Sequence, residues 1–575
     1  MILKRRPGKI LVSCEVSRAI DREAQGEWGF NSFSLIEAAG RNCARVFEEA
    51  FPEFFARRKE SSGPRVCLAA GTGNNGADAM VMLRYWILEG QLDPAACAVV
   101  LSRLPNIGES SPWTEILKSL EKMKVPVFAW DEIKRSKADG ITHNIFAGAD
   151  LILDGISGTG LEGPLRGAAL EMAEAINALG RMPPGSMPPG RIPADSGSRG
   201  AGSASFKKPL VVSVDLPSGL SDSWEPGMSV IEADITLAIS PAKYCLYTQA
   251  ARPKAGTILP VLGIFPDGLT EKCEGIEILS WDDIKGEIPK IPPEAYKNSR
   301  GTVEIRAGSK GSAGAAIIAA RGAQAAGAGL VRLVVDDDIY PVVAPALRGS
   351  MAAPASSESD AFKGRFKPDA ILLGPGWGGG EDRLTVMEKA LELEKAGIPL
   401  ILDADAIELA KDRTFNGNVI LTPHPGEFSR YTGIKTEELL CRPVPALKKY
   451  ARERGAYILL KAHVSTIVSP DGRTAVIDGM LPVLAAGGSG DLLAGFCAAI
   501  AARMAKSGSG FDAFSCAAAA CSLLFASARC FMNRFTDPME IADKAADIAG
   551  LAWLGGFPPF QVDAGNVTGG SRNGR

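Results

Sequence analysis

Short, nearly continuous runs of valine, isoleucine and leucine recur along the first half of the chain. They lie at residues 65–70, 96–102, 150–155 and 209–219, and stretches rich in alanine, leucine and charged residues separate them. Strands that are buried on both faces have this continuous apolar character, and helices join parallel strands. The pattern therefore predicts a parallel sheet with helices on both of its faces.

The same alternation begins again in the second half. Apolar runs lie at 301–309, 329–336, 369–376, 399–405, 418–424 and 456–462. Because strands and helices alternate in both halves, the chain predicts two three-layer α/β/α domains. A further apolar stretch at 511–531 is interrupted by serines and by Arg529, so it predicts a buried helix and not a membrane span.

The composition changes near the middle of the chain, where three prolines and many charged residues occur without a sustained period. We therefore expect a first domain at 1–278, a linker at 279–298 and a second domain at 299–562, with each domain able to fold alone. Residues 181–205 are rich in proline, glycine and serine and predict a disordered insertion, and 563–575 predict a flexible tail.

The charge balance and the cysteine pattern exclude several classes of protein. The formal net charge is −3, without a long run of one sign, whereas a protein that binds polyanions by counterion release needs a basic excess. We therefore expect neither a nucleic-acid nor a membrane partner. Eleven cysteines without a CxxC pair, and only three histidines, are typical of a reduced cytoplasmic protein and argue against structural zinc. No export signal is visible at the N-terminus.

Polar residues gather at the ends of the predicted strands of the first half. The turn at 71–76 has the form GxGxxG, which aims backbone amides at a phosphate. It is weak as a dinucleotide fingerprint, because no carboxylate ends the next strand. Each cluster could instead cap a helix, but four clusters at one sheet edge predict a ligand site. The clusters are Asn74, Asn75 and Asp78; Asp154 with 158–160; Asp215 with Ser218; and Asp234 with Thr236 and Lys243.

A second glycine-rich turn, at 485–491, lies directly before a helical run. Backbone amides at such a helix start can hold a transferred phosphoryl group while Asp491 takes the proton of the accepting hydroxyl. Asp491 could instead only stabilise the helix dipole. His424 lies in a rigid turn, which favours ligand contact, and Lys461 ends a strand where it could meet phosphate. Further turns rich in glycine or polar residues follow other predicted strands of this half, at 308–315, 374–378, 403–405 and 422–427.

Five motifs of the first half follow one another over about residues 10–275: LIEAAGRNCA, GTGNNGADA, DLILDGISGTGL, VDLPSGL and ADITLAISPAK. In this order they resemble the NAD(P)H-hydrate epimerases, and the domain is expected to be Rossmann-like. The resemblance implies potassium ligands at Asn75, Asp154 and Ser218, an oxygen-rich set that suits a hard cation, and proton transfer near Asp215. It implies that the hydrated nucleotide contacts Asn74, Asn75, Gly76, Ala77, Asp78, Gly158, Thr159, Gly160, Leu161, Glu162, Gly163, Pro164 and Asp215.

Five motifs of the second half cover about residues 290–560: GSKGSAGAA, GPGWG, LDADAIELA, LTPHPGEF and AAGGSGDLLAG. They resemble the ADP- or ATP-dependent NAD(P)H-hydrate dehydratases, which have the ribokinase-like fold. The resemblance implies that Asp491 is the catalytic base and that Mg²⁺ accompanies the nucleotide. It implies substrate contacts at Ala315, Gly376, Gly378, His424 and Asp491. It implies adenine-nucleotide contacts at Lys461, Ala462, His463, Val464, Ser465 and Gly490.

The two resemblances together predict a bifunctional, homo-oligomeric repair enzyme of the cytoplasm. Its first domain would interconvert the R and S hydrates of NADH and NADPH. Its second domain would use ADP or ATP to dehydrate the S hydrate, with release of AMP or ADP and phosphate. Two alternatives are a ribokinase-type small-molecule kinase fused to a nucleotide-binding domain, and a nucleotide-binding protein without catalysis.

Overall fold

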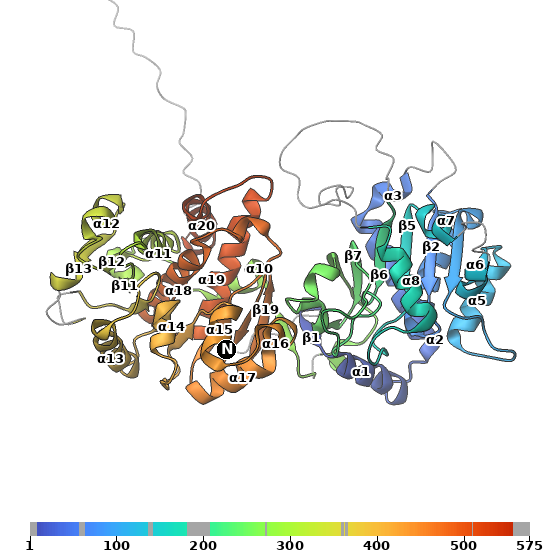
Figure 1. The fold of residues 1–575 in the computed structure, drawn as a ribbon, viewed down its shortest axis with the longest axis horizontal. Coiled ribbons are helices and arrows are strands. Elements are labelled where there is room, and N and C mark those ends of the chain that lie inside the picture. The colour runs from blue at the N-terminus through green and yellow to red at the C-terminus, as the bar shows by residue number, and fades with distance from the viewer. Residues whose placement is uncertain are drawn as a thin grey trace, which may run out of the picture.

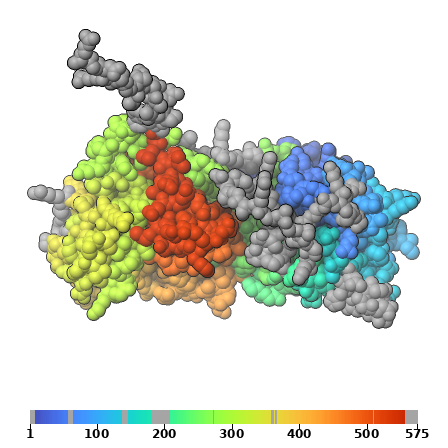
Figure 2. Space-filling model, turned by 90° about the horizontal axis from the view of Figure 1, so that it is seen from above, coloured from blue at the N-terminus to red at the C-terminus, as the bar shows by residue number. Residues whose placement is uncertain are grey.

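The computed structural model describes residues 8–56, 64–135, 142–180, 208–270, 273–357, 362, 366–508 and 510–555. The helices and strands gather in two bodies that lie side by side, one from each half of the chain (Figure 1). Figure 2 shows the same division from above, with the blue and cyan residues at one end of the molecule and the yellow residues at the other. The insertion expected at 181–205 and the tail expected at 563–575 lie outside the described residues.

Within the described residues, the N-terminal sheet has seven strands in the order β4-β3-β2-β5-β6-β7-β9, and all neighbouring pairs are parallel. The chain runs outward from β2 to β4 and then returns to the other side of β2 as β5. The strand order therefore reverses between β2 and β5, where α/β folds of this kind bind ligands. The strands are β2 (Val66–Ala70), β3 (Cys97–Leu101), β4 (Val127–Ala129), β5 (Leu151–Gly155), β6 (Leu210–Val214), β7 (Ile235–Ile239) and β9 (Thr257–Val261).

Helices cover both faces of this sheet. One apolar core lies between the sheet and α2, α4 and α5, and another lies between the sheet and α6, α7 and α8. Side chains of β2 alternate between the two cores, as a strand buried on both faces requires. The predicted three-layer, Rossmann-like architecture is confirmed. The helices are α1 (Cys14–Gly26), α2 (Ser32–Ala50), α3 (Pro52–Ala56), α4 (Asn74–Leu88), α5 (Pro112–Lys122), α6 (Trp130–Arg135), α7 (Thr142–Ala147), α8 (Gly167–Asn177) and α9 (Asp267–Thr270).

The C-terminal sheet has twelve strands in the described chain, in the order β13-β12-β11-β14-β15-β16-β17-β18-β19-β10-β1-β8. The strands from β13 to β17 are parallel, whereas β18 is antiparallel to both of its neighbours. The C-terminal half contributes β11 (Thr302–Arg306), β12 (Leu330–Val335), β13 (Met351–Pro354), β14 (Ala370–Leu373), β15 (Leu400–Leu402), β16 (Val419–Leu421), β17 (Tyr457–Leu460), β18 (Val464–Val468) and β19 (Thr474–Asp478).

Helices also cover both faces of the second sheet. Its larger core lies under α11 (Ala313–Ala325), α18 (Ser489–Lys506), α19 (Ala513–Ala528) and α20 (Pro538–Trp553). The segment 513–531 is apolar and long enough to cross a membrane, but 78% of its most apolar window is buried in the protein, so the predicted buried helix is confirmed. The remaining helices are α12 (Tyr340–Ala346), α13 (Glu381–Lys395), α14 (Asp405–Leu409), α15 (Pro425–Thr432), α16 (Thr436–Cys441) and α17 (Pro443–Arg454).

Three short strands from the first half extend the second sheet. They are β10 (Ile276–Ile278), which pairs with β19, then β1 (Ile10–Val12) and β8 (Ala242–Lys243). Polar contacts add to this junction, because Arg252 lies 2.8 Å from the Asp478 carboxylate and Arg442 lies 3.0 Å from Glu225. The two halves are therefore joined by a continuous sheet as well as by the chain.

The expected linker at 279–298 is packed structure over much of its length. Residues 281–284 form α10, and Ile284 and Ile288 are buried in the second core. The ring of Trp281 lies edge-on against Trp553 of α20, with 5.3 Å between the ring centroids. The composition did not predict this packing, because prolines and charged residues dominate the segment and its buried apolar side chains are few.

We predict that a fragment of residues 299–575 melts on the order of 10 °C below a fragment of residues 280–575. The longer fragment keeps Ile284 and Ile288, whose burial contributes about 3–6 kcal/mol together. Thermal unfolding followed by circular dichroism measures the difference. Equal melting temperatures would show that 280–298 does not stabilise the domain, and failure of both fragments to fold would contradict the expected independence of the two domains.

Candidate active sites

A cavity of about 540 Å³ opens at the point where the order of the N-terminal strands reverses. The turn after β2 and the turn after β5 form its walls, as the sequence predicts for this sheet edge. Ala77 is completely buried beneath the turn, and Glu162, Gly163 and Pro164 do not line the cavity. The predicted residues that do line it are Asn74, Asn75, Gly76, Asp78, Gly158, Thr159, Gly160, Leu161 and Asp215.

Asp154, at the end of β5, is completely buried beside this cavity. Its Oδ2 accepts hydrogen bonds from Ser213 Oγ at 2.7 Å and from the Ser218 backbone N–H at 2.8 Å. Its Oδ1 accepts a hydrogen bond from Ser218 Oγ at 2.5 Å. Burial raises the pKa of Asp154, and these hydrogen bonds oppose the rise. Among the described residues, the partners of this carboxylate are hydroxyl and backbone N–H groups and no basic side chain.

Asn75 completes an oxygen-lined group with Asp154 and Ser218. The Nδ2 of Asn75 donates to the Ser157 carbonyl at 2.8 Å, and Ser218 Oγ lies 3.2 Å from the same carbonyl. The Oδ1 of Asn75 is buried and has no hydrogen-bond partner in the described structure. A buried oxygen without a partner is costly unless a cation or water meets it. The three residues therefore fit a hard cation held by oxygen ligands.

Asp215 and Lys243 form a buried ion pair at the same cavity. Their Oδ1 and Nζ atoms are 2.6 Å apart, and Lys243 also donates to the Ile239 carbonyl at 3.0 Å. Asp215 has a left-handed backbone, with φ of +64°, which is strained for a residue with a side chain. Burial, together with the nearby charge of Asp215, raises the pKa of Asp78 well above its usual range. The cavity thus places the Asp215–Lys243 ion pair near a buried carboxyl group whose pKa is raised.

Helix α1 contributes Arg18, Asp21 and Arg22 to the cavity, which the sequence prediction missed. The spacing of Arg18 and Arg22, four residues apart on one helix, could have indicated a shared face. Another part of the prediction was wrong: Asp234 precedes β7 and accepts a hydrogen bond from the Val211 N–H at 2.9 Å. Asp234 and Thr236 therefore lie at the amino ends of the strands, away from the cavity, where they hold the backbone.

In the C-terminal half, Asp491 lies in the first turn of α18, directly after the glycine-rich turn. The helix is capped by Gly488, whose φ of +94° a residue with a side chain rarely adopts. Burial raises the pKa of Asp491 to about 6, and the charge of Asp403 adds to the rise while Lys461 opposes it. A carboxylate with this pKa is suited to accept a proton near neutral pH.

Lys461, at the end of β17, points toward the same region. Its Nζ lies 2.6 Å from Asp403 Oδ1, and Thr422 Oγ1 donates to the same oxygen at 2.7 Å. Burial lowers the pKa of Lys461, but the carboxylates of Asp403, Glu427 and Asp491 outweigh burial and raise it. A Cβ atom added to Gly490 would lie 3.4 Å from Lys461 Nζ, so Lys461 lies beside the α18 turn. The predicted nucleotide residue is therefore next to the predicted base.

The turn after β14 approaches the start of α11. A side chain at Gly376 would come within 2.7 Å of Ser312 Cβ and 3.0 Å of Ala315 Cβ, and its φ of +55° also favours glycine. Ser309 Oγ donates to the Gly376 carbonyl at 2.9 Å, and the Gly378 N–H donates to Asp405 Oδ2 at 2.7 Å. The structure thus brings Ala315, Gly376 and Gly378 together, as the motif order implied.

His424 is exposed and caps α15. Its Nδ1 accepts hydrogen bonds from the backbone N–H groups of Gly426 at 3.0 Å and Glu427 at 3.3 Å. This leaves Nε2 directed outward, 3.5 Å from a Glu427 carboxylate oxygen. In the predicted nucleotide loop 461–465, Ser465 Oγ bonds within the turn to Ala462, and His463 Nε2 lies 2.9 Å from the Gln249 carbonyl of the first half. Those two side chains have structural partners already.

Two α/β domains, each with a polar site at the carboxyl ends of parallel strands, define an enzyme that acts on phosphate-bearing ligands. Residues 303–548 match the family model of NAD(P)H-hydrate dehydratase, and residues 32–245 match that of the YjeF-related protein N-terminus. The chain belongs to the family of bifunctional NAD(P)H-hydrate repair enzymes. This confirms the resemblance found in the sequence and favours it over a kinase or a protein without catalysis.

Curated relatives match along both halves. The repair enzyme of Hyperthermus butylicus is 30% identical over 516 residues, which cover 86% of this chain and 84% of the relative. That of Salinibacter ruber is 29% identical over 514 residues, which cover 84% and 86%. Among solved structures, the chain is similar to the ADP/ATP-dependent NAD(P)H-hydrate dehydratase of Bacillus subtilis co-crystallized with ATP/Mg²⁺. The sequence identity is 27% and the TM-score is 0.43, and the match covers 49% of this chain and 100% of that chain.

Proposed function

We propose that this chain restores hydrated NADH and NADPH, with its N-terminal domain as epimerase and its C-terminal domain as nucleotide-dependent dehydratase. The observation that carries the proposal is the position of Asp491. It lies in the first turn of a helix behind a glycine-rich turn, beside Lys461, with its pKa raised to about 6. This is the arrangement that a base needs in order to deprotonate a hydroxyl while a phosphoryl group arrives.

In the epimerase domain, the strand-order reversal holds the nucleotide. We assign Asn75, Asp154 and Ser218 as the residues that would hold K⁺, which would supply positive charge for the substrate phosphates. Asp215 takes the proton of the C6 hydroxyl and passes it to the ring nitrogen as the C6–N1 bond breaks. Rotation of the resulting carbonyl and the reverse transfer close the ring with inverted C6. Lys243, whose Nζ lies 2.6 Å from Asp215 Oδ1, holds that carboxylate in place between these transfers.

In the dehydratase domain, Asp491 accepts the proton of the C6 hydroxyl as the hydroxyl oxygen attacks the terminal phosphorus of ADP or ATP. The bond from that phosphorus to the bridging oxygen breaks, and AMP or ADP leaves. Electron donation from the ring nitrogen then expels phosphate from C6, and loss of the C5 proton restores the double bond. The amides of the 485–491 turn stabilise charge on the transferred group, and Lys461 adds positive charge next to them. Mg²⁺ bound with the nucleotide would neutralise phosphate charge.

A coupled assay tests the proposal. The purified chain is given a mixture of R and S hydrates with ADP or ATP, and the return of reduced-nicotinamide absorbance is followed. Complete conversion is expected, because epimerisation feeds the R hydrate into dehydration. Conversion that stops after the S hydrate would show that the epimerase assignment is wrong, and accumulation of a stable phosphorylated product would indicate a kinase.

We predict that kcat/KM for dehydration falls about tenfold per pH unit below pH 6 and is level above it. The reason is that Asp491 accepts a proton only in its charged form, and its pKa is about 6. In Asp403→Asn, the loss of a neighbouring carboxylate should move the midpoint to lower pH, since the charge of Asp403 helps to raise that pKa. Steady-state rates measured across pH check both expectations. A profile without an acid limb would contradict the role of Asp491.

A further inference from the structure

Two cysteines from distant parts of the sequence lie side by side in the N-terminal half. Cys14 and Cys245 are both buried, and their Sγ atoms are 4.0 Å apart although the residues are 231 positions apart. The strand register causes this. β1 and β8 are parallel with Val12 opposite Lys243, and each cysteine is the second residue after that pair. Because the two parallel strands end at the same level, the residues that follow them place the two thiols next to each other.

The carboxylate of Asp222 lies close to both thiols. Its Oδ2 accepts a hydrogen bond from the Cys14 backbone N–H at 2.7 Å. One ligand atom from each of the three residues can be chosen so that all of them lie within 4.8 Å of one another. Asp222 is exposed, so solvent reaches its side chain.

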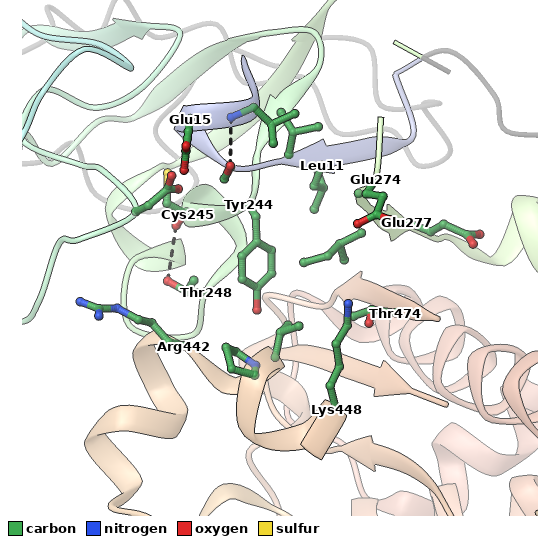
Figure 3. Close-up of a pocket in the computed structure, with 18 of the residues that line it drawn as sticks. Leu11, Glu15, Tyr244, Cys245, Thr248, Glu274, Glu277, Arg442, Lys448 and Thr474 are labelled. Carbon is green, nitrogen blue, oxygen red and sulfur yellow. Dashed lines mark hydrogen bonds between the residues drawn. The ribbon is translucent and has the colours of Figure 1, made fainter. Parts of the chain in front are cut away.

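Asp222 and Cys245 line a cavity of about 1180 Å³ between the two halves, and Cys14 lies between its lining residues Ser13 and Glu15. Figure 3 shows Cys245 and Glu15 on the side of the cavity that the N-terminal half forms, and Arg442 and Lys448 on the side that the C-terminal half forms. The cavity gives a small ion a path to the thiols, and the carboxylates of Glu15 and Asp222 make the side formed by the N-terminal half attractive to a cation.

We propose that Cys14, Cys245 and Asp222 bind a zinc ion, with the fourth position taken by water from the cavity. Two thiolates and one carboxylate are ligands of the kinds that zinc accepts, and zinc prefers tetrahedral geometry. Binding would form two Zn–S bonds and one Zn–O bond and release the two thiol protons to solvent. No electrons are transferred, so no oxidant is needed.

The sulfur separation favours a metal over a disulfide. Two Zn–S bonds of about 2.3 Å at a tetrahedral angle place the sulfurs roughly 3.8 Å apart. The observed 4.0 Å differs little from that separation. A disulfide bond is only about 2.05 Å long, so it would require the sulfurs to move together by about half of their present separation. No CxxC pair marks this site in the sequence, because its ligands come from three separate segments.

The ion would connect the segments that carry the epimerase ion pair. Asp222 follows Asp215 in the same loop, and Cys245 comes two residues after Lys243. A zinc ion at this place would hold both segments relative to β1 and would therefore help to position the Asp215–Lys243 pair. This consequence rests on the proposed function, whereas the metal site itself does not.

Metal binding to the full chain tests the proposal without any assay of activity. After chelator treatment and gel filtration, the protein is titrated with Co²⁺, whose bonds to thiolates absorb in the near ultraviolet. We expect a charge-transfer band that saturates at one equivalent, disappears when Zn²⁺ is added, and is accompanied by release of two protons per Zn²⁺ in weakly buffered solution. Absence of the band in the wild-type chain would overturn the proposal.

Variants assign the band to these residues. Cys14→Ser and Cys245→Ser should each weaken Zn²⁺ affinity at least 100-fold, while Cys530→Ser, at an exposed cysteine, should bind as the wild type does. If the cysteine variants do not fold, Asp222→Asn tests the site in their place. It should weaken the affinity for Zn²⁺ on the order of 10-fold or more. An unchanged band in all three site variants would contradict the assignment. A disulfide would be shown instead if the thiol count of the wild type, purified without reductant and measured in denaturant, fell two short of its eleven cysteines and stayed the same when Cys14 and Cys245 were both replaced by serine.

Discussion

Asp491→Asn is expected to lower kcat for dehydration by on the order of 100- to 10,000-fold while the affinity for ADP or ATP stays nearly unchanged. Asparagine keeps the size of the side chain but cannot accept the hydroxyl proton. Ground-state binding depends instead on the amides of the glycine-rich turn and on Lys461. Single-turnover rates and calorimetric titration with nucleotide measure the two effects on the same preparation. Near-normal turnover would exclude Asp491 as the base.

The same variant should be more stable than the wild type at neutral pH. Folding raises the pKa of Asp491 from 3.8 to about 6, so the charged carboxylate costs stability above pH 6 and the cost vanishes below about pH 4. A shift of this size corresponds to about 1–3 kcal/mol, which asparagine would recover only at the higher pH. Thermal melts at about pH 7.5 and about pH 4 check the sign.

Glu540→Gln is a matched control for these two effects. Glu540 occupies the first turn of α20, as Asp491 does in α18, but it is paired with Arg534 at 2.9 Å and lies outside the site. If first-turn charge alone mattered, both variants would lose stability through the helix dipole and keep their activity. We expect that result for Glu540→Gln only.

Asp154→Ala is expected to reduce epimerisation on the order of 100-fold or more, because the nucleotide loses the cation and the ordered loop that position it. Dehydration of the S hydrate should be unaffected, since Asp154 lies in the other domain. Rates with the separated R and S hydrates distinguish the two activities. Added K⁺ should stimulate epimerisation by the wild type and should not restore it in Asp154→Ala.

Asp150→Ala provides the control for Asp154→Ala. Asp150 directly precedes the same strand, at its opposite end, and accepts a hydrogen bond from the Arg65 N–H at 2.8 Å. Both variants remove a carboxylate next to β5, but only one removes a proposed cation ligand. Equal losses of epimerisation, or a loss of both activities in Asp154→Ala, would indicate a folding defect and contradict the assignment.

The apolar runs predicted most of the parallel strands and the edges at which both sites lie. β2, β5 and β11 fall within runs recognised from composition alone, because strands buried on both faces have no polar positions to interrupt them. Asn75 follows β2 and Asp154 ends β5, so both lie at the carboxyl edge that these parallel strands share.

The remaining features depend on contacts between distant segments. β1, β8 and β10 have two or three residues each, too few for a recognisable period, and they form strands only because they pair with one another and with β19. The Asp215–Lys243 ion pair likewise joins residues from different loops. Asp234 was misplaced because an aspartate at either end of a strand gives the same local pattern.

The strand junction between the two halves also sets the order in which the protein can be completed during synthesis. β1 is among the first segments to leave the ribosome, yet its neighbour β10 is made more than 250 residues later, and β19, which anchors β10 to the second sheet, nearly 200 residues after that. Until β19 is made, β10 is an edge strand, because β1 and β8 cover only its other side. The unpaired backbone groups of such a strand can pair with other chains. In a chain that stops before residue 474, the epimerase domain would fold with the backbone groups of this strand unpaired and exposed. We therefore expect nascent and truncated chains to be the forms that aggregate or bind chaperones.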